Sequence, residues 1–209
     1  MTLSELVDVV EQQTNVDSII NTVLGNFEDY PHLQKGFESF MGDNERYDFE
    51  DFQQNVINIL NEIDNFSDDE FDALEMAIDD QGPWYFEDTV DIINRGDYIY
   101  FPGVSTDEEL GKAYIDMIGS VEDAIDKSRL TFYIDIDEVA DTFQRDAELS
   151  GDEESEDWDH DTWYDIAAEM VENNPEEYVD DYFDYDAYGR DLRIEGGWYF
   201  GDLGAISIQ

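Results

Sequence analysis

The feature that most limits how this chain can fold is its charge. Its 57 Asp and Glu residues stand against nine Lys and Arg, which gives a net charge of -48. So much like charge repels itself and opposes a compact state, and such acidity is typical of disordered chains poor in aromatic residues. This chain instead carries 13 Tyr, 13 Phe and 4 Trp. We therefore expect a folded protein that uses its charge, and the readiest partner is a protein surface built to hold nucleic acid.

The composition also excludes several kinds of site and location. The chain has no Cys, which excludes disulfides and thiolate metal sites and fits a reducing compartment. No apolar run approaches the roughly 18 residues of a membrane helix, and Met1–Glu5 lacks the basic start of a signal peptide. Anionic membranes and nucleic acid would both repel the chain. We expect a cytoplasmic protein that binds neither of them.

Hydrophobic periodicity predicts a helix-rich α+β fold, arranged as an elongated chain of small domains. Residues 1–65 carry four apolar stripes at helical spacing and predict a helical N-terminal domain. Residues 66–150 predict a central acidic α/β domain with a strand at 98–101. Residues 151–209 predict a C-terminal α/β domain, and the turn signals between Leu192 and Ile208 indicate a terminal β-hairpin.

An internal repeat connects the last two of these domains. Tyr133–Ala140 and Tyr182–Gly189 share the order aromatic, apolar, Asp, apolar, Asp, any residue, apolar, small. A comparable helix is expected before each copy, at Leu110–Met117 and at Tyr164–Met170. The run Leu130–Ile136 is aromatic and β-branched, with an alternation that suits a strand. We therefore expect two related small α/β units.

One predicted helix carries a face made only of acidic residues. Ser67 and Glu70 have the spacing of a capping box and mark its start. Like charges three or four residues apart destabilise an isolated helix by roughly 0.2–0.5 kcal/mol per pair, and an ordinary solvated face alternates signs. Successive turns place such carboxylates about 5.4 Å apart, comparable to the phosphate spacing of a nucleic-acid strand. We interpret this stripe as facing a partner, with a solvated face as the alternative. Its members are Asp68, Asp72, Glu75 and Asp79.

Other acidic segments extend this set of candidate phosphate surrogates. The run Gly151–Asp161 is almost purely acidic and predicts a solvated loop. The further candidates are Asp107, Glu108, Glu109, Asp152, Glu153, Glu154, Glu156, Asp157, Asp159, Asp161, Glu169, Glu172, Glu176 and Glu177. Tyrosines near the C-terminus are most simply core residues, but Tyr is also enriched at subunit interfaces. The candidates for a homodimer interface are Tyr182, Tyr185 and Tyr188.

Motifs for catalysis and metal binding are absent or incomplete. Asp157–Asp161 begins like a calcium loop, but Thr162 stands where Gly is needed and Ala168 where a bidentate Glu is needed. His32 and His160 lie in no zinc-binding pattern, and neither a nucleophile elbow nor a phosphate-binding glycine loop occurs. We expect no catalytic, cofactor or metal site, and no enzyme. Nine cations without a basic patch also argue against direct contact with nucleic acid.

The C-terminal region resembles a known family. Residues Asp184–Leu192 read DYDAYGRDL and precede Gly196 and an apolar hairpin. This segment resembles the end of the ArdA antirestriction proteins, whose pattern is D-Y-x-A-[YL]-[GA]-R-D-[LM]. The helix from Trp163 is similar too, and the resemblance is closest over residues 160–209. Residues 1–65 lack the strand-rich opening of that family.

The resemblance implies a DNA mimic encoded by mobile elements or phages. Proteins of this family are elongated homodimers whose carboxylates imitate the phosphates of bent duplex DNA. They occupy the DNA groove of type I restriction–modification enzymes, and their C-terminal region is associated with dimerisation and antirestriction. We therefore expect a DNA-binding host-defence enzyme as partner.

Three alternatives stay open. A mimic aimed at another defence nuclease, such as a CRISPR effector, would have the same sequence features. A histone-chaperone-like acidic module would bind free basic proteins indiscriminately, whereas a mimic should compete with DNA for one enzyme. A salt-adapted protein would use its acidity only to stay in solution, but this chain is unusually rich in Tyr, Phe and Ile for that class.

Overall fold

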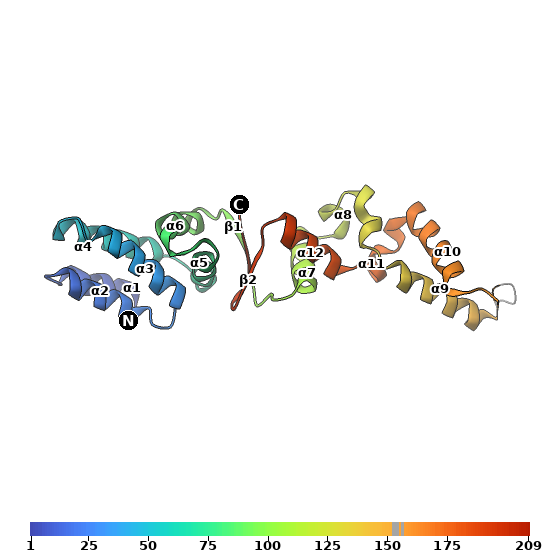
Figure 1. The fold of residues 1–209 in the computed structure, drawn as a ribbon, viewed down its shortest axis with the longest axis horizontal. Helices are drawn as coiled ribbons and strands as arrows, with labels where there is room; N and C mark the ends of the chain where they lie inside the picture. Colours follow the sequence, from blue (N-terminus) through green and yellow to red (C-terminus); the bar gives the residue numbers. More distant parts are fainter. Residues whose placement is uncertain (152–154, 156) are drawn as a thin grey trace. The chain divides into compact units, whose positions relative to one another are not determined.

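The computed structural model of the protein describes residues 1–151, 155 and 157–209, apart from the side chains of residues 122 and 127. Helices form most of the described chain, and a small antiparallel sheet accompanies them (Figure 1). The predicted helix-rich α+β class is confirmed. In the described part of the chain, no helix is both long and apolar enough to cross a bilayer.

The chain forms two compact units rather than the three segments expected from the sequence. Unit 1 combines Met1–Ser105 with Gly197–Gln209, and unit 2 is Thr106–Gly196. The expected boundary near residue 65 falls inside unit 1, because the helices on both sides of it share one hydrophobic core. The expected boundary near residue 150 falls inside unit 2 for the same reason.

Unit 1 is built on helices that pack around this shared core. Phe37, Phe52 and Phe86 are its largest fully buried side chains. Thr2 and Ser67 form the predicted capping boxes at the starts of α1 and α5. In Figure 1 the first four helices lie side by side. The helices are α1 Leu3–Glu11, α2 Val16–Asn26, α3 Pro31–Asn44, α4 Phe49–Ile63, α5 Asp68–Gln81, the 3-10 helix η1 Pro83–Tyr85 and α6 Phe86–Arg95.

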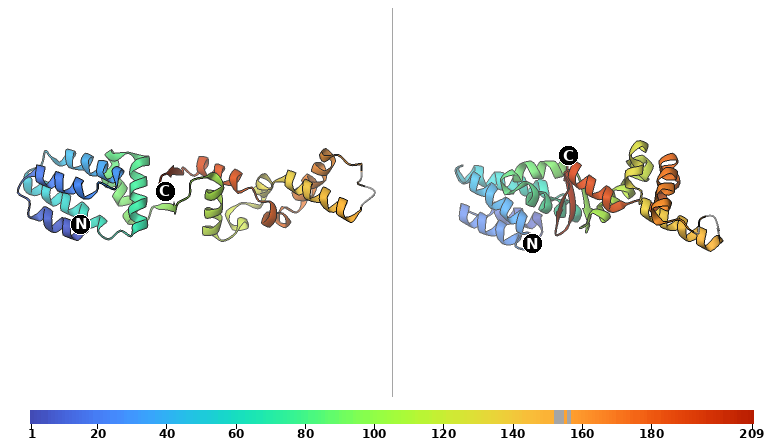
Figure 2. Two further views of the ribbon diagram at one scale, coloured as in Figure 1. Left: turned by 90° about the horizontal axis from the view of Figure 1, so that it is seen from below. Right: turned by 45° about the vertical axis from the view of Figure 1, so that its right-hand side comes forward.

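The sheet of unit 1 joins segments from distant parts of the sequence (Figure 2). Strand β3, Gly204–Ile208, is central and pairs antiparallel with β1, Tyr98–Pro102, and with β2, Tyr199–Gly201. Ile206 of β3 contributes to the core beneath the sheet. The predicted strand at 98–101 and the predicted hairpin are therefore confirmed, although residues 192–195 belong to the preceding helix.

Unit 2 contains both copies of the repeat, and the copies pack crosswise. The helix before each copy packs on the helix that follows the other copy, so α7 lies beside α12 and α10 beside α9 (Figure 1). The elements are α7 Asp107–Ile118, α8 Val121–Ala124, η2 Lys127–Tyr133, α9 Ile136–Ser150, α10 His160–Asn173, η3 Pro175–Glu177, α11 Val179–Tyr182 and α12 Tyr185–Glu195.

The two copies also touch each other at one β-bridge. Ile134 pairs antiparallel with Phe183, and the backbone N–H groups of Asp135 and Asp184 donate to carbonyls of the opposite copy at 2.9 and 2.6 Å. Each Asp then caps the helix that follows it. The expected strand over Leu130–Ile136 is wrong, because η2 occupies its first part and only this bridge remains of the extended pairing.

Helices α7 and α12 approach closely because each has a glycine at the crossing. A Cβ added at Gly189 would come within 1.7 Å of the carbonyl oxygen of Asp107, and one at Gly111 within 2.3 Å of that of Tyr185. Both glycines are buried. The crossing therefore depends on glycine at both positions, since no side chain fits between the two backbones.

Candidate partner-binding surface

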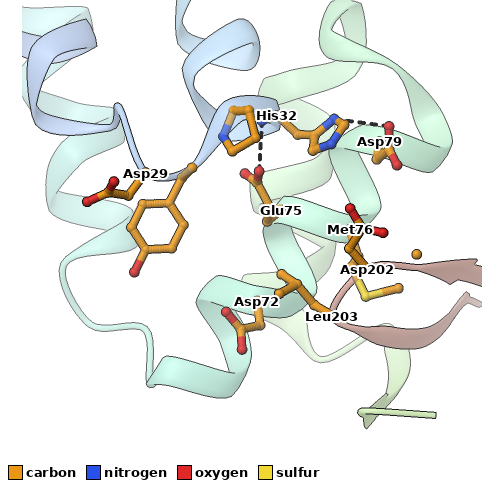
Figure 3. A pocket seen from close by; sticks show the side chains of 11 residues that line it. Asp29, His32, Asp72, Glu75, Met76, Asp79, Asp202 and Leu203 are labelled. Carbon is orange, nitrogen blue, oxygen red and sulfur yellow. Dashed lines mark hydrogen bonds and ion pairs between the residues drawn. The ribbon is translucent and has the colours of Figure 1, made fainter. Parts of the chain in front are cut away.

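The acidic stripe of α5 does not face solvent as a whole. Three of its four carboxylates, Asp72, Glu75 and Asp79, line a hollow of about 210 Å³ together with the start of α3 and the β2–β3 turn (Figure 3). The remaining lining residues are Asp29, Tyr30, Pro31, His32, Met76, Gly201, Asp202 and Leu203. The stripe therefore belongs to an internal junction of unit 1 as well as to its surface.

Glu75 is a structural residue rather than a phosphate surrogate. Its side chain is 5% exposed and accepts hydrogen bonds from the backbone N–H of His32 at 2.8 Å and of Leu33 at 2.6 Å. These donors belong to the first turn of α3, where Pro31 is the first residue and Tyr30 provides no side-chain cap. A carboxylate at a helix N-terminus accepts hydrogen bonds from free N–H groups, and its negative charge interacts favourably with the helix dipole. The partner-facing interpretation of Glu75 is therefore wrong.

Asp79 connects three elements of unit 1. Its carboxylate lies 3.0 Å from Nδ1 of His32 and accepts a hydrogen bond from the Tyr199 hydroxyl of β2. This hydrogen bond, followed by partial burial, raises the pKa of Tyr199 to about 12. The Asp79 side chain is 35% exposed, so it remains accessible while it holds α3, α5 and β2 together.

The start of α5 keeps the most open part of the stripe. Asp68 is exposed, and Asp72 is half-buried at the rim of the hollow. Burial, followed by the charges of Asp69 and Asp68, raises the pKa of the Asp72 carboxyl. Burial is the main cause of this shift, and the two neighbouring charges add to it, so a cation from a partner would favour the charged form of Asp72.

The acidic start of α7 contains one half-buried carboxylate and two exposed ones. Arg193 of α12 donates to both carboxylate oxygens of Asp107, at 2.6 and 3.1 Å, and the Asp107 side chain is 17% exposed. Glu108 and Glu109 are exposed, and Glu108 forms an ion pair with Lys112 one turn later. Asp107 therefore holds α7 to α12, and the two glutamates are the accessible candidates here.

Near the acidic loop, the described candidates are exposed. Asp157, Asp159 and Asp161 all reach solvent. Asp159 also caps α10, since its carboxylate accepts from the backbone N–H of Thr162 at 3.0 Å and from its hydroxyl at 2.6 Å. These hydrogen bonds lower the pKa of Asp159. The remaining candidates of this run lie outside the described residues, namely Asp152, Glu153, Glu154 and Glu156.

Carboxylates also lie in the last turns of helices, where negative charge lowers helix stability. Asp80 lies in the last turn of α5 and Glu172 in the last turn of α10, and neither last turn holds a basic residue. The helix dipole opposes negative charge at this end by an amount on the order of 0.3–1 kcal/mol. Helix formation therefore does not account for these charges. The exposed candidates of this region are Glu169, Glu172, Glu176 and Glu177.

The three candidate interface tyrosines are part of the core of unit 2 or of its margin. Tyr188 is 5% exposed, and its ring lies 5.2 Å from that of Tyr133. Tyr182 and Tyr185 are half-buried and pack against the same core. A dimer interface through Tyr188 is therefore excluded in this conformation, because its ring is already enclosed.

The segment that resembles the ArdA proteins has internal partners in unit 2. Asp184 caps α12 through the N–H of Ala187 at 2.9 Å, and Asp191 accepts from the Tyr133 hydroxyl at 2.8 Å. Arg190 pairs with Asp186 within the helix. The motif residues thus hold α12 in place, which gives them a structural role whatever the partner is.

Sequence reasoning missed the hollow and the role of Glu75. Helical periodicity places Glu75 on the polar side of α5, and a charged residue there is normally solvated. One signal was present, because Tyr30 before Pro31 is a helix start without a capping residue. The free backbone N–H groups of such a start require acceptors from elsewhere in the fold. The sequence does not identify Glu75 as that acceptor.

Comparisons with known proteins identify no relative. No protein-family model matches the chain, and neither a curated protein sequence nor a solved structure matches it. Among the described residues, no group of three or more His, Asp or Glu side chains is placed to hold a metal ion.

Proposed function

We propose that this protein mimics double-stranded DNA and inhibits a host-defence enzyme by occupying its DNA-binding groove. One observation carries the proposal. Of the described acidic side chains, Glu75 alone is buried, so in the described part of this chain of net charge -48 the other carboxylates are at least partly exposed. Several of them occupy helix ends that disfavour negative charge, which suggests selection for the charge itself.

The proposed mechanism is competition for basic side chains. A DNA-binding groove is lined with Lys and Arg that neutralise phosphates, and carboxylates can replace those phosphates as counter-charges. Duplex DNA carries one charge per about 1.7 Å, so 48 charges correspond to about 24 base pairs if all were displayed. Association should be fast and weakened by salt. The protein would perform no chemical step and need no cofactor.

We propose a type I restriction–modification enzyme as the target, with the inhibitor acting in the cytoplasm as a homodimer. The resemblance of Asp184–Leu192 to the ArdA proteins supports this choice. A mimic of another defence nuclease, such as a CRISPR effector, would rest on the same charge and is the second candidate.

A displacement experiment tests the proposal. A purified type I restriction–modification enzyme is bound to a fluorescent duplex, and the protein is added at several salt concentrations. We expect full displacement near one inhibitor dimer per DNA-binding groove, and weaker displacement as salt rises. Polyglutamate of equal total charge is the control and should displace the duplex less well at equal charge concentration.

Two results would contradict the proposal. If the protein leaves the duplex bound to every defence enzyme tested, DNA mimicry is wrong. If it binds free histones as tightly as the enzyme, and the duplex does not compete, the chaperone-like alternative is favoured.

A further inference from the structure

An exposed aromatic pair projects from unit 1 at the turn between α5 and α6. Trp84 is 79% exposed and Tyr85 is 56% exposed, both in η1. Large aromatic side chains at such exposure are costly to leave in water and are enriched in binding hot spots. Trp84 is not part of the hydrophobic core of unit 1, so its ring is accessible to a partner.

The backbone holds the Trp84 ring in a defined place. Gly82 has a φ of +92°, which favours glycine, and the ring of Pro83 fixes its own φ at the first position of η1. A Cβ added at Gly82 would lie 3.3 Å from the Trp84 ring, so the indole rests against this turn. The Trp84 indole contacts the turn with one face and solvent with the other. It therefore loses little conformational freedom when a flat group stacks on its exposed face.

Carboxylates surround this aromatic pair. Trp84 and Tyr85 line a shallow hollow with Asp43 of α3 and with Glu87 and Asp88 of α6, all three exposed. Partial burial and the neighbouring charges, of which that of Asp88 is the largest, raise the pKa of the Glu87 carboxyl. The surface therefore offers an aromatic face beside three carboxylates, and Arg46 lies in the adjoining hollow with Asp43 and Glu87.

This combination matches one chemical group. We propose that Trp84 stacks on an arginine guanidinium of the partner while Asp43, Glu87 and Asp88 accept its hydrogen bonds. A guanidinium is planar, stacks on aromatic faces and forms bidentate hydrogen bonds with carboxylates, whereas a lysine ammonium is a compact, strongly hydrated charge. The same chemistry already occurs inside the chain, where the Arg46 guanidinium lies 5.9 Å from the centre of the Tyr47 ring.

Other occupants fit this surface less well. A second copy of the chain would bring more carboxylates to an acidic surface, and a nucleic-acid base would bring its phosphates. An arginine from a basic groove brings the complementary charge. The inference deepens the proposed function, because it identifies an arginine-reading position within a surface otherwise described only by its charge.

Tryptophan side-chain NMR on the full chain tests this directly. The chain has four Trp, so ¹⁵N-indole labelling gives four signals, and Trp84→Phe assigns the one of interest. The probes are two peptides of equal length and charge, one with arginines and one with lysines. We expect the Trp84 signal to shift with the arginine peptide and much less with the lysine peptide. Trp84→Ala should weaken binding of the arginine peptide about 2- to 10-fold, the range of a partly exposed cation–π contact.

The chain provides matched controls. Trp158 is 41% exposed next to Asp157 and Asp159, but its ring packs 4.8 Å from that of Trp163, so Trp158→Phe should leave the arginine preference intact. Glu87→Gln keeps the ring and removes one carboxylate acceptor, so it should weaken binding of the arginine peptide more than that of the lysine peptide. Circular dichroism verifies that Trp84→Ala remains folded.

Three outcomes would overturn the inference. The Trp84 signal could stay unchanged, it could shift equally with both peptides, or it could shift with protein concentration alone, which would indicate a second copy. The proposed function fails differently, since then neither the wild-type protein nor Trp84→Ala displaces a duplex from a defence enzyme. If mimicry holds and this inference fails, both proteins displace the duplex equally.

Discussion

Glu75 shows how a charged residue on a polar helix face becomes part of the core. Its two carboxylate oxygens accept from the backbone of α3 and take the place of a side-chain cap. Glu75→Ala leaves one buried and one partly buried N–H group without acceptors, and we expect it to lower the free energy of unfolding by about 1–3 kcal/mol. Urea unfolding followed by circular dichroism measures this. Asp69→Ala, at an exposed position of the same helix, should change stability by no more than about 0.5 kcal/mol.

Tyr199 gives a prediction for alkaline pH. Its pKa is raised to about 12 by the hydrogen bond to Asp79, so the folded state prefers the neutral hydroxyl. A group with a raised folded pKa contributes stability that is complete below its unfolded pKa, near 10, and is lost as pH rises towards 12. We expect Tyr199→Phe to be less stable than the wild type at pH 8, and the difference to shrink between pH 10 and 12. Denaturation at several pH values measures it.

An exposed ring supplies the comparison for Tyr199. Tyr47 is 48% exposed, and Tyr47→Phe serves as the comparison for loss of a hydroxyl elsewhere in unit 1. If both variants change the alkaline pH dependence of the unfolding free energy equally, the hydrogen bond between Tyr199 and Asp79 does not stabilise unit 1.

At the scale of elements, the crossing of α7 and α12 depends on two glycines. Gly189→Ala would place a methyl group against the Asp107 carbonyl and force the helices apart, and we expect it to destabilise unit 2 by about 2 kcal/mol or more. Gly25→Ala is the matched control, because a Cβ there meets nothing within 4 Å inside α2. It should stabilise the protein by up to about 1 kcal/mol. Equal stability of the two variants in urea would contradict this account of the crossing.

The sequence predicts local structure well in this chain and long-range pairing poorly. Thr2, Ser67 and Thr106 start helices where their side chains cap the first turn, which depends only on neighbouring residues. The pairing of β1 with β3 depends on residues about half the chain apart, and the crosswise packing of the repeat depends on tertiary contacts. The accessible carboxylates of the candidate surface could not be predicted for the same reason, because burial by other elements decides which of them reach solvent.

For the whole molecule, the excess of negative charge should control stability. Repulsion among exposed carboxylates opposes folding and is screened by salt. We expect the protein to be folded in 10 mM salt and its melting temperature to rise as monovalent salt increases to 500 mM. Differential scanning calorimetry measures this. Unfolding at low salt, together with no affinity for a DNA-binding enzyme, would favour the salt-adapted alternative.

The charge load of the whole molecule also predicts how inhibition responds to mutation. Because many carboxylates would share the contact, neutralising one, as in Asp68→Asn or Glu172→Gln, should change duplex displacement by no more than about 3-fold. Neutralising several together should weaken it strongly and reduce its salt dependence. A single neutralisation that abolished inhibition would indicate a localised site and would contradict distributed mimicry.

The central position of β3 has a consequence for biosynthesis. This strand lies between β1 and β2 and supplies Ile206 to the core of unit 1, yet it follows unit 2 in the chain. A ribosome must therefore finish all of Thr106–Gly196 before unit 1 can close its sheet. Unit 2 can fold during that interval, while the core of unit 1 lacks the side chains that β3 supplies. The nested order of the two units thus delays completion of unit 1 until unit 2 has been synthesised.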